Sequence, residues 1–122
     1  MLIHNYLKAQ LTPERIHEGE GVCPHAMVFR GDEIDAPVQF INYTILPPGA
    51  SFGLHEHGRD NEFYVVLSGS GEYFENGKET PVEAGDIIMN APEASHGIRN
   101  TGRVDMPLLV FEVAIQHCEE HT

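Results

Sequence analysis

The chain has 122 residues, of which 41% are hydrophobic, and its 7 basic and 19 acidic residues give a formal net charge of −12. This length and composition predict one compact domain spanning residues 1–122, and the negative charge argues against binding to nucleic acid or to anionic membrane surfaces. Its apolar runs are far too short to span a bilayer, and residues 1–10 lack the apolar core of a signal peptide, so we expect a cytoplasmic protein with no membrane partner.

The first part of the chain, residues 1–35, is interpreted as a short N-terminal arm. Thr12 could cap a helix whose first residue is Pro13, which is a common combination at helix starts. Gly19 and Gly21 follow closely, so this predicted helix is limited to about one turn.

From residue 36 to residue 115 the sequence is typical of an all-β domain. Runs rich in β-branched and aromatic residues predict strands at 38–46, 62–67, 72–75, 78–82, 87–91, 96–100 and 108–115. Gly, Pro and Asn mark the corners between them, including a type II turn at Pro47-Pro48-Gly49 and a two-residue hairpin at Asn76-Gly77. Short strands at such intervals predict a sandwich or a jelly roll.

Two histidines and a glutamate have the spacing of a metal site. Side chains alternate along a strand with a rise of roughly 3.3 Å per residue, so His55 and His57 would point to the same face about 6.6 Å apart. If residues 58–61 form a hairpin loop, Glu62 lies opposite His57. The hairpin would then bring two imidazoles and a carboxylate to one point. A polar surface hairpin that binds nothing is the alternative.

This pattern resembles the first motif of the cupin superfamily, in which a Gly is followed by His-x-His, a Glu and a second Gly. The matching residues are Gly49, His55, His57, Glu62 and Gly69. The second motif of the family resembles the segment from Gly85 through His96 to Asn100 in its outer spacing. Its interior differs, because Pro92 lies one place later than usual and Glu93 stands where a Gly is expected.

The resemblance covers roughly residues 36–115 and implies a cupin double-stranded β-helix, a jelly-roll barrel, with an N-terminal arm before it and a tail at 116–122. It also implies a metal bound by His55, His57, Glu62 and His96. In this family such arms often pack on a second subunit, so the resemblance implies a homodimer. It does not name a reaction, because one fold hosts many functions.

The implied donor set suits manganese or iron, with nickel, zinc and copper as alternatives. Iron and manganese accept six ligands, so four protein ligands leave two adjacent positions for a small molecule, whereas four ligands close a tetrahedral zinc site. We favour a metal-dependent enzyme acting on a small oxygen-bearing molecule by oxygenase, decarboxylase, lyase or isomerase chemistry. The alternative is a non-catalytic binding module that uses the same metal site, because few acid–base residues are evident near it.

Four further polar residues are candidates near the site. Tyr64 shares its strand face with Glu62, so it is the candidate for a proton donor or a substrate hydrogen bond, and filling the barrel mouth is its alternative role. Asn100 is expected to stabilise a turn rather than to take part in chemistry. His25 and Arg30 could reach the pocket from the arm, although a surface position is the commoner one for such residues.

The remaining predictions concern apolar residues, cysteines and the tail. Phe40, Phe52, Met89 and Phe111 suggest an apolar lining of the pocket, although such residues are more often simply core. Cys23 and Cys118 lie far apart in no paired spacing, so we expect free thiols. The histidines near the C-terminus are not expected to form a second metal site, because chain ends seldom hold ligands firmly.

Overall fold

The computed structural model describes residues 1–56, 60–92 and 94–115. In chain order its elements are η1 (Tyr6–Lys8), β1 (Thr12–Glu14), η2 (Ile16–Glu18), β2 (Cys23–Arg30), η3 (Gly31–Glu33), β3 (Val38–Leu46), β4 (Ser51–Glu56), β5 (Asp60–Val66), β6 (Ser70–Glu75), β7 (Lys78–Glu83), β8 (Ile87–Asn90), β9 (Ser95–Arg99) and β10 (Met106–Ala114). The three η elements are single 3₁₀ turns. None of the helices in these ranges is long and apolar enough to cross a membrane.

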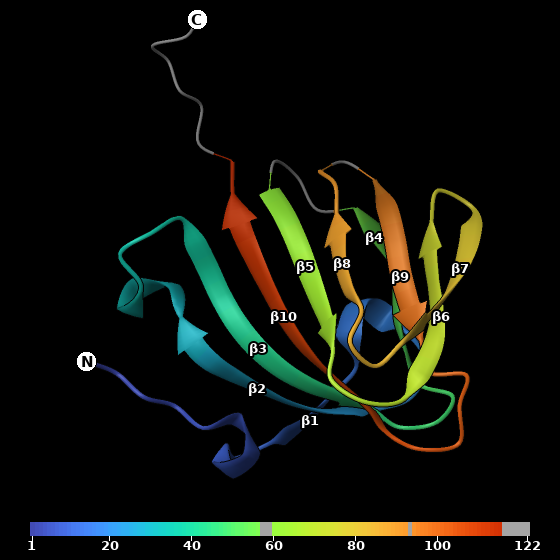
Figure 1. The fold of residues 1–122 in the computed structure, drawn as a ribbon, viewed down its shortest axis with the longest axis horizontal. Coiled ribbons are helices and arrows are strands. Elements are labelled where there is room, and N and C mark those ends of the chain that lie inside the picture. Colours follow the sequence, from blue (N-terminus) through green and yellow to red (C-terminus); the bar gives the residue numbers. More distant parts are fainter. Residues whose placement is uncertain (57–59, 93, 116–122) are drawn as a thin grey trace, which may run out of the picture.

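The strands form two antiparallel sheets. The larger sheet has the order β1-β2-β3-β10-β5-β8, and the smaller one has the order β4-β9-β6-β7. Figure 1 shows the larger sheet on the left and the smaller sheet on the right, as the two walls of a barrel. The predicted all-β jelly roll is therefore confirmed.

Most of the corners predicted from the sequence are also confirmed, since each depends on a local turn. Gly49 has φ +85, and the amide of Ala50 donates to the Pro47 carbonyl at 2.9 Å, which closes the type II turn. Asn76 (φ 49) and Gly77 (φ 86) both adopt the left-handed backbone of a two-residue hairpin, and Glu75 pairs with Lys78 across it.

The helix predicted from residue 12 is wrong. Thr12–Glu14 instead forms the edge strand β1, in which Pro13 is tolerated because an edge strand can leave one side of its backbone unpaired. A 3₁₀ turn follows this strand at η2, where His17 and Glu18 have positive φ angles of 50 and 57. Much of the predicted arm thus belongs to the larger sheet, because β2 pairs along β3.

The hairpin loop predicted at residues 58–61 lies partly outside the described residues. Strands β4 and β5 are neighbours in the chain, but β4 pairs with β9 in the smaller sheet and β5 pairs with β10 and β8 in the larger one. The described residues of β4 and β5 therefore belong to different sheets, and each strand pairs with partners distant in the sequence, as is usual for jelly-roll strands.

Apolar side chains from the two sheets meet in the barrel interior. Leu46 and Leu108 from the larger sheet and Phe52 and Ile98 from the smaller sheet belong to one buried cluster. Each such side chain contributes about 1.5–3 kcal/mol when it is fully buried. This core holds the two sheets at a fixed separation and so places side chains from opposite walls within reach of each other.

Candidate metal centre

Three potential metal ligands meet between the two sheets. They are His55 at the end of β4, His96 in β9 and Glu62 in β5, and one donor atom from each lies within 4.8 Å of the others. The Nε2 atom of His96 is 2.9 Å from Oε1 of Glu62, and Nε2 of His55 is 3.5 Å from the same oxygen. His96 and Glu62 are buried. Figure 1 shows that the three strands come from both walls.

The strand pairing explains how the two imidazoles come together. His55 and His96 are register partners of β4 and β9, and their rings pack edge to face with centroids 4.4 Å apart. The Nδ1 atom of His55 is 3.1 Å from the carbonyl oxygen of Gly53, to which a protonated Nδ1 donates. In that tautomer the lone pair of the His55 imidazole is on Nε2, the atom near Glu62.

The electrostatics of the cluster favour an ionised carboxylate. Burial raises the pKa of Glu62, but hydrogen bonds and charge from His55 and His96 outweigh it and hold the pKa well below its usual range. Burial lowers the pKa of His55, and the hydrogen bonds to Glu62 and Gly53 overcome that effect and raise it. A carboxylate beside two imidazole nitrogens is a donor set that suits divalent first-row metals, so these residues fit a metal ion.

A second acidic residue lies beside Glu62. Glu112 of β10 is its register partner, and burial, the hydrogen bond to Asp60 and the charge of Glu62 raise the pKa of Glu112 to about 9. Glu112 is therefore protonated at neutral pH in the absence of metal. The sequence analysis missed this residue. The available signal was a single acid within the apolar run 106–114, on the same strand face as buried Val110.

A cavity of about 310 Å³ opens beside the cluster and includes Glu62 and Glu112 in its lining. One wall is the η2 segment, which we define as residues 15–20 and which contributes Arg15, Ile16 and His17. The ring of His17 stacks on that of His55, with centroids 3.5 Å apart and planes 12° from parallel. This segment packs closely on β4, because a Cβ atom on Gly53 would overlap the His17 carbonyl oxygen. No sequence motif indicated a role for His17.

The structure brings together three of the four predicted ligands, namely His55, Glu62 and His96. His57 lies outside the described residues. Tyr64 is fully buried, packs edge to face against Phe52 and is not part of the cavity lining. Its hydroxyl makes no hydrogen bond of standard geometry within the described ranges, and burial, followed by the charge of Glu62, raises its pKa well above the usual value.

His25 and Arg30 have different positions. His25 lines the cavity, whereas Arg30 is an exposed residue whose Nε is 3.1 Å from Asp32. The turn role of Asn100 is confirmed. Its Nδ2 donates to the carbonyl oxygens of Leu46 (2.7 Å) and Val104 (2.8 Å), and its Oδ1 accepts from the backbone amide of Gly102 (2.8 Å).

The prediction of an apolar lining is correct for two of the four residues. Phe40 and Phe52 line the cavity. Met89 is 58% exposed, and Phe111 stacks on Phe63 with centroids 4.9 Å apart, on the strand face opposite to Glu62 and Val110. Which face a residue takes depends on register, which the sequence alone did not determine.

The two cysteines are only partly described. Cys23 is a buried free thiol, and burial raises its pKa to about 11, so it has little thiolate character. Cys118 and the histidines of the tail lie outside the described residues.

Comparison with known proteins finds a family model and relatives that match this chain. The family model described as Cupin domain matches residues 42–112. The oxalate-binding protein of Thermotoga maritima is 36% identical over 110 residues, which are 88% of this chain and 91% of that protein.

Solved structures show the same barrel. The crystal structure of a predicted oxalate decarboxylase from Thermotoga maritima matches with a TM-score of 0.89 and 28% identity, covering 93% of this chain and 100% of that one. A cupin 2 conserved barrel domain protein from Salinispora arenicola has a TM-score of 0.73 and 20% identity, covering 93% and 88%, and supports the fold alone.

Proposed function

The chain belongs to the cupin family, and from this premise we propose that it is a metal-dependent enzyme that acts on a small carboxylate. His55, Glu62 and His96 would hold a divalent ion, manganese or iron in preference to nickel, zinc or copper, with His57 as a fourth ligand. The observation that supports the proposal most directly is the meeting of the three donor atoms within 4.8 Å beside a cavity.

A bound ion of this kind would polarise a carboxylate as a Lewis acid. The residues of the chain would hold the ion, supply a proton and line the cavity. Glu62 remains ionised, and the Gly53 carbonyl orients the His55 ring. Glu112 lines the same cavity and can present a proton to a ligand oxygen. Phe40 and Phe52 add apolar surface to the cavity wall. An acidic proton donor next to the ligands favours an enzyme over a passive binding module.

The choice of carboxylate is supported by the relatives. One is an oxalate-binding protein, and another is a predicted oxalate decarboxylase. The first of these descriptions also favours the second candidate function, a non-catalytic module that binds a dicarboxylate at the metal. Tyr64, proposed from the sequence as a proton donor, is replaced by Glu112 in this role, because Glu112 lines the cavity and Tyr64 is enclosed in the core.

The test begins with metal content. Elemental analysis should find about one divalent ion per chain, and His55→Ala and His96→Ala should each lose it, while the control His4→Ala, at an exposed histidine, should retain it. Calorimetry should then detect oxalate binding to the manganese form. Carbon dioxide release or oxygen consumption with small carboxylates would separate the enzyme from the binding module. Full metal occupancy in His96→Ala would contradict the proposed centre.

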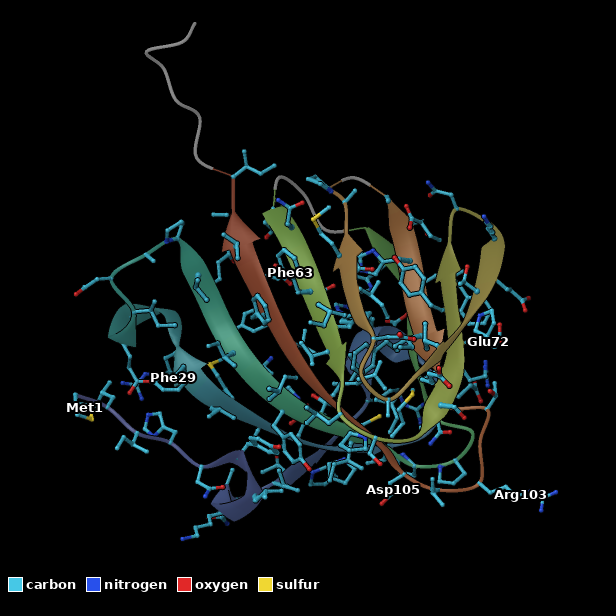
Figure 2. The ribbon with its side chains drawn as sticks, viewed as in Figure 1. Met1, Phe29, Phe63, Glu72, Arg103 and Asp105 are labelled. Atoms are coloured by element: carbon cyan, nitrogen blue, oxygen red, sulfur yellow. The ribbon has the colours of Figure 1, made fainter. Side chains whose placement is uncertain are left out.

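We also propose a homodimer as the working form. The outer face of the larger sheet carries the stacked pair Phe63 and Phe111, with Met89 58% and Ile87 67% exposed nearby on β8. Figure 2 shows Phe63 on β5 next to β10. Light scattering should give twice the mass of the chain, and Met89→Glu should shift the mass toward the monomer. A monomer at all concentrations would refute this arrangement.

A further inference from the structure

The cavity continues past the metal centre to three polar side chains on β2 and β3, which we call the polar shelf: His25, Asn42 and Thr44. His25 and Thr44 are register partners, and Nδ1 of His25 shares a hydrogen bond of 2.6 Å with Oγ1 of Thr44. Thr44 is buried, and so is the Oδ1 atom of Asn42. Polar groups in a barrel interior are expected to have partners.

The side-chain amide of Asn42 indicates that the polar shelf binds a ligand. Its Oδ1 has no hydrogen-bond partner within residues 1–56, 60–92 and 94–115. A buried amide oxygen without a partner is unfavourable, so a cavity-lining Asn of this kind is suited to meet a ligand. The amide can both donate and accept, and so can the hydroxyl of Thr44.

The polar shelf lies at a distance from the metal centre. Glu62, Glu112 and Phe40 are consecutive register partners across β5, β10 and β3. Asn42 and Thr44 follow Phe40 along β3 by about 6.6 Å and 13 Å, given a rise of roughly 3.3 Å per residue. Apolar Phe40, Phe52 and Val110 also line this cavity. Oxalate, the smallest dicarboxylate, could not reach both ends.

The polar shelf is also uncharged. Burial lowers the pKa of His25, which keeps its imidazole neutral at neutral pH. Arg15 lines the cavity from the η2 segment, but its Nη1 donates to the Gly19 carbonyl at 2.8 Å. Glu62 and Glu112 place two carboxyl groups at the other end of the cavity. The three side chains of the polar shelf carry no positive charge, so a second carboxylate on the ligand would find no ionic partner among them.

We propose that the ligand is longer than oxalate: a carboxylic acid with a short apolar body and an uncharged distal oxygen that hydrogen-bonds to Asn42 and Thr44. This inference rests on the proposed function, because the acid group would bind at the metal centre. The cavity volume of about 310 Å³ agrees with it, since small-molecule pockets start at roughly 300 Å³.

The test is calorimetry with the manganese-loaded protein, whose metal content is measured for every variant. Four probes separate the contributions of the acid group, the apolar body and the distal group: oxalate, phenylpyruvate, 4-hydroxyphenylpyruvate and glutarate. The distal hydroxyl should make 4-hydroxyphenylpyruvate bind about tenfold more tightly than phenylpyruvate, which is the gain expected from one good hydrogen bond. Thr44→Val and Asn42→Leu should each remove most of this advantage. Both should leave oxalate affinity and metal content unchanged, as should the control Thr101→Val at an exposed position.

Two results would overturn the inference. One is equal affinity of the wild-type protein for the two aromatic acids. The other is tighter binding of glutarate, which carries a charged distal group, than of 4-hydroxyphenylpyruvate. Oxalate affinity reports the integrity of the site, and the two substitutions serve as independent tests if one variant folds poorly. Failure of the proposed function can be distinguished from failure of this inference, because the wild-type protein would then bind neither metal nor oxalate.

Discussion

At the scale of single residues, Glu62 connects the parts of the candidate centre. Its Oε1 atom lies near both imidazoles, and its strand neighbour Glu112 holds a proton that Glu62 lacks. Adjacent carboxyl groups divide in this way because two like charges at short distance cannot both be stable in a buried site. The ionised Glu62 can therefore bind a cation, and the protonated Glu112 can donate a hydrogen bond.

The first prediction concerns the charge of Glu62. Glu62→Gln keeps the shape of the side chain but removes its negative charge, so manganese affinity should fall by more than about 100-fold, beyond the loss typical of residues that only support metal ligands. Metal titration by calorimetry measures the change. Glu79→Gln, at an exposed position on β7, is the control and should bind metal normally. Unchanged affinity in Glu62→Gln would show that this carboxylate is not a ligand.

The second prediction concerns Glu112 in the metal-free protein. Its pKa is about 9 in the folded state against an ordinary value of 4.5, so between these pH values the folded state holds a proton that the unfolded state has lost. The free energy of unfolding should therefore decrease as pH rises from 4.5 to 9. Glu112→Gln cannot ionise and should flatten this decrease. Denaturant unfolding at intervals across the range tests it, and identical slopes for both proteins would count against it.

The residues of the centre differ in how far the sequence could predict them. His55, Glu62 and His96 follow from motif spacing. Glu112 stands out in the sequence only as an acid within an apolar run, and its nearness to the ligands, like that of His17, depends on the β5–β10 register and on the packing of η2 against β4. Those relations join residues far apart in the chain, and no local pattern encodes them.

At the scale of elements, the η2 segment forms a wall that is held by close backbone contact. Gly53 of β4 faces the His17 carbonyl, and Gly19 faces the Ser51 carbonyl, with no room for a Cβ atom at either glycine. His17 and Glu18 have positive φ angles within the same segment. This geometry places the His17 ring on the His55 ring and closes one side of the cavity.

A third prediction follows from this packing. Gly53→Ala should push the η2 segment away from β4 and lower the free energy of unfolding by about 1–3 kcal/mol, the range for overpacked sites. It should also weaken metal binding, because the carbonyl of Gly53 orients His55. Leu54→Ala, at the adjacent exposed residue, is the control. A variant as stable as the wild type would show that η2 is held loosely.

The elements also show where local sequence signals fail. Turns at Gly49 and Asn76-Gly77 were predictable because backbone conformation at these positions is a local property. The segment at Thr12 has good helix-start residues, yet it pairs with Cys23–His25 as a strand, because strand pairing offers more hydrogen bonds than one isolated helical turn.

At the scale of the whole molecule, the core and the strand ladders hold the barrel independently of the metal. The buried cluster draws on both sheets, whereas the three ligands join them at one place. A metal that binds only the folded state adds stability according to its concentration, about 2.7 kcal/mol at a hundred times its dissociation constant. Metal should therefore raise the thermal midpoint without being required for folding.

The fourth prediction links metal and pH. Protons compete with metal for imidazole nitrogen, and the raised pKa of His55 strengthens that competition in the metal-free site. Metal affinity should decrease with more than first-order proton dependence as pH falls from roughly 6.5, and the thermal midpoint should fall with it. Chelation at neutral pH should lower the midpoint but leave the far-ultraviolet circular dichroism unchanged. Complete unfolding on chelation would identify the metal as structural.

The position of β10 determines when the centre can form as the chain folds. This strand, Met106–Ala114, lies in the middle of the larger sheet between β3 and β5, which precede it by 40 residues or more along the chain. Until β10 inserts, β5 lacks the longer of its two neighbouring strands, and Glu62 is not held opposite the histidines. Such non-local pairing is slow. In pulse-labelling hydrogen exchange, protection of β5 should therefore coincide with that of β10, so metal would be acquired at the last stage of folding, after the final strand has entered the sheet.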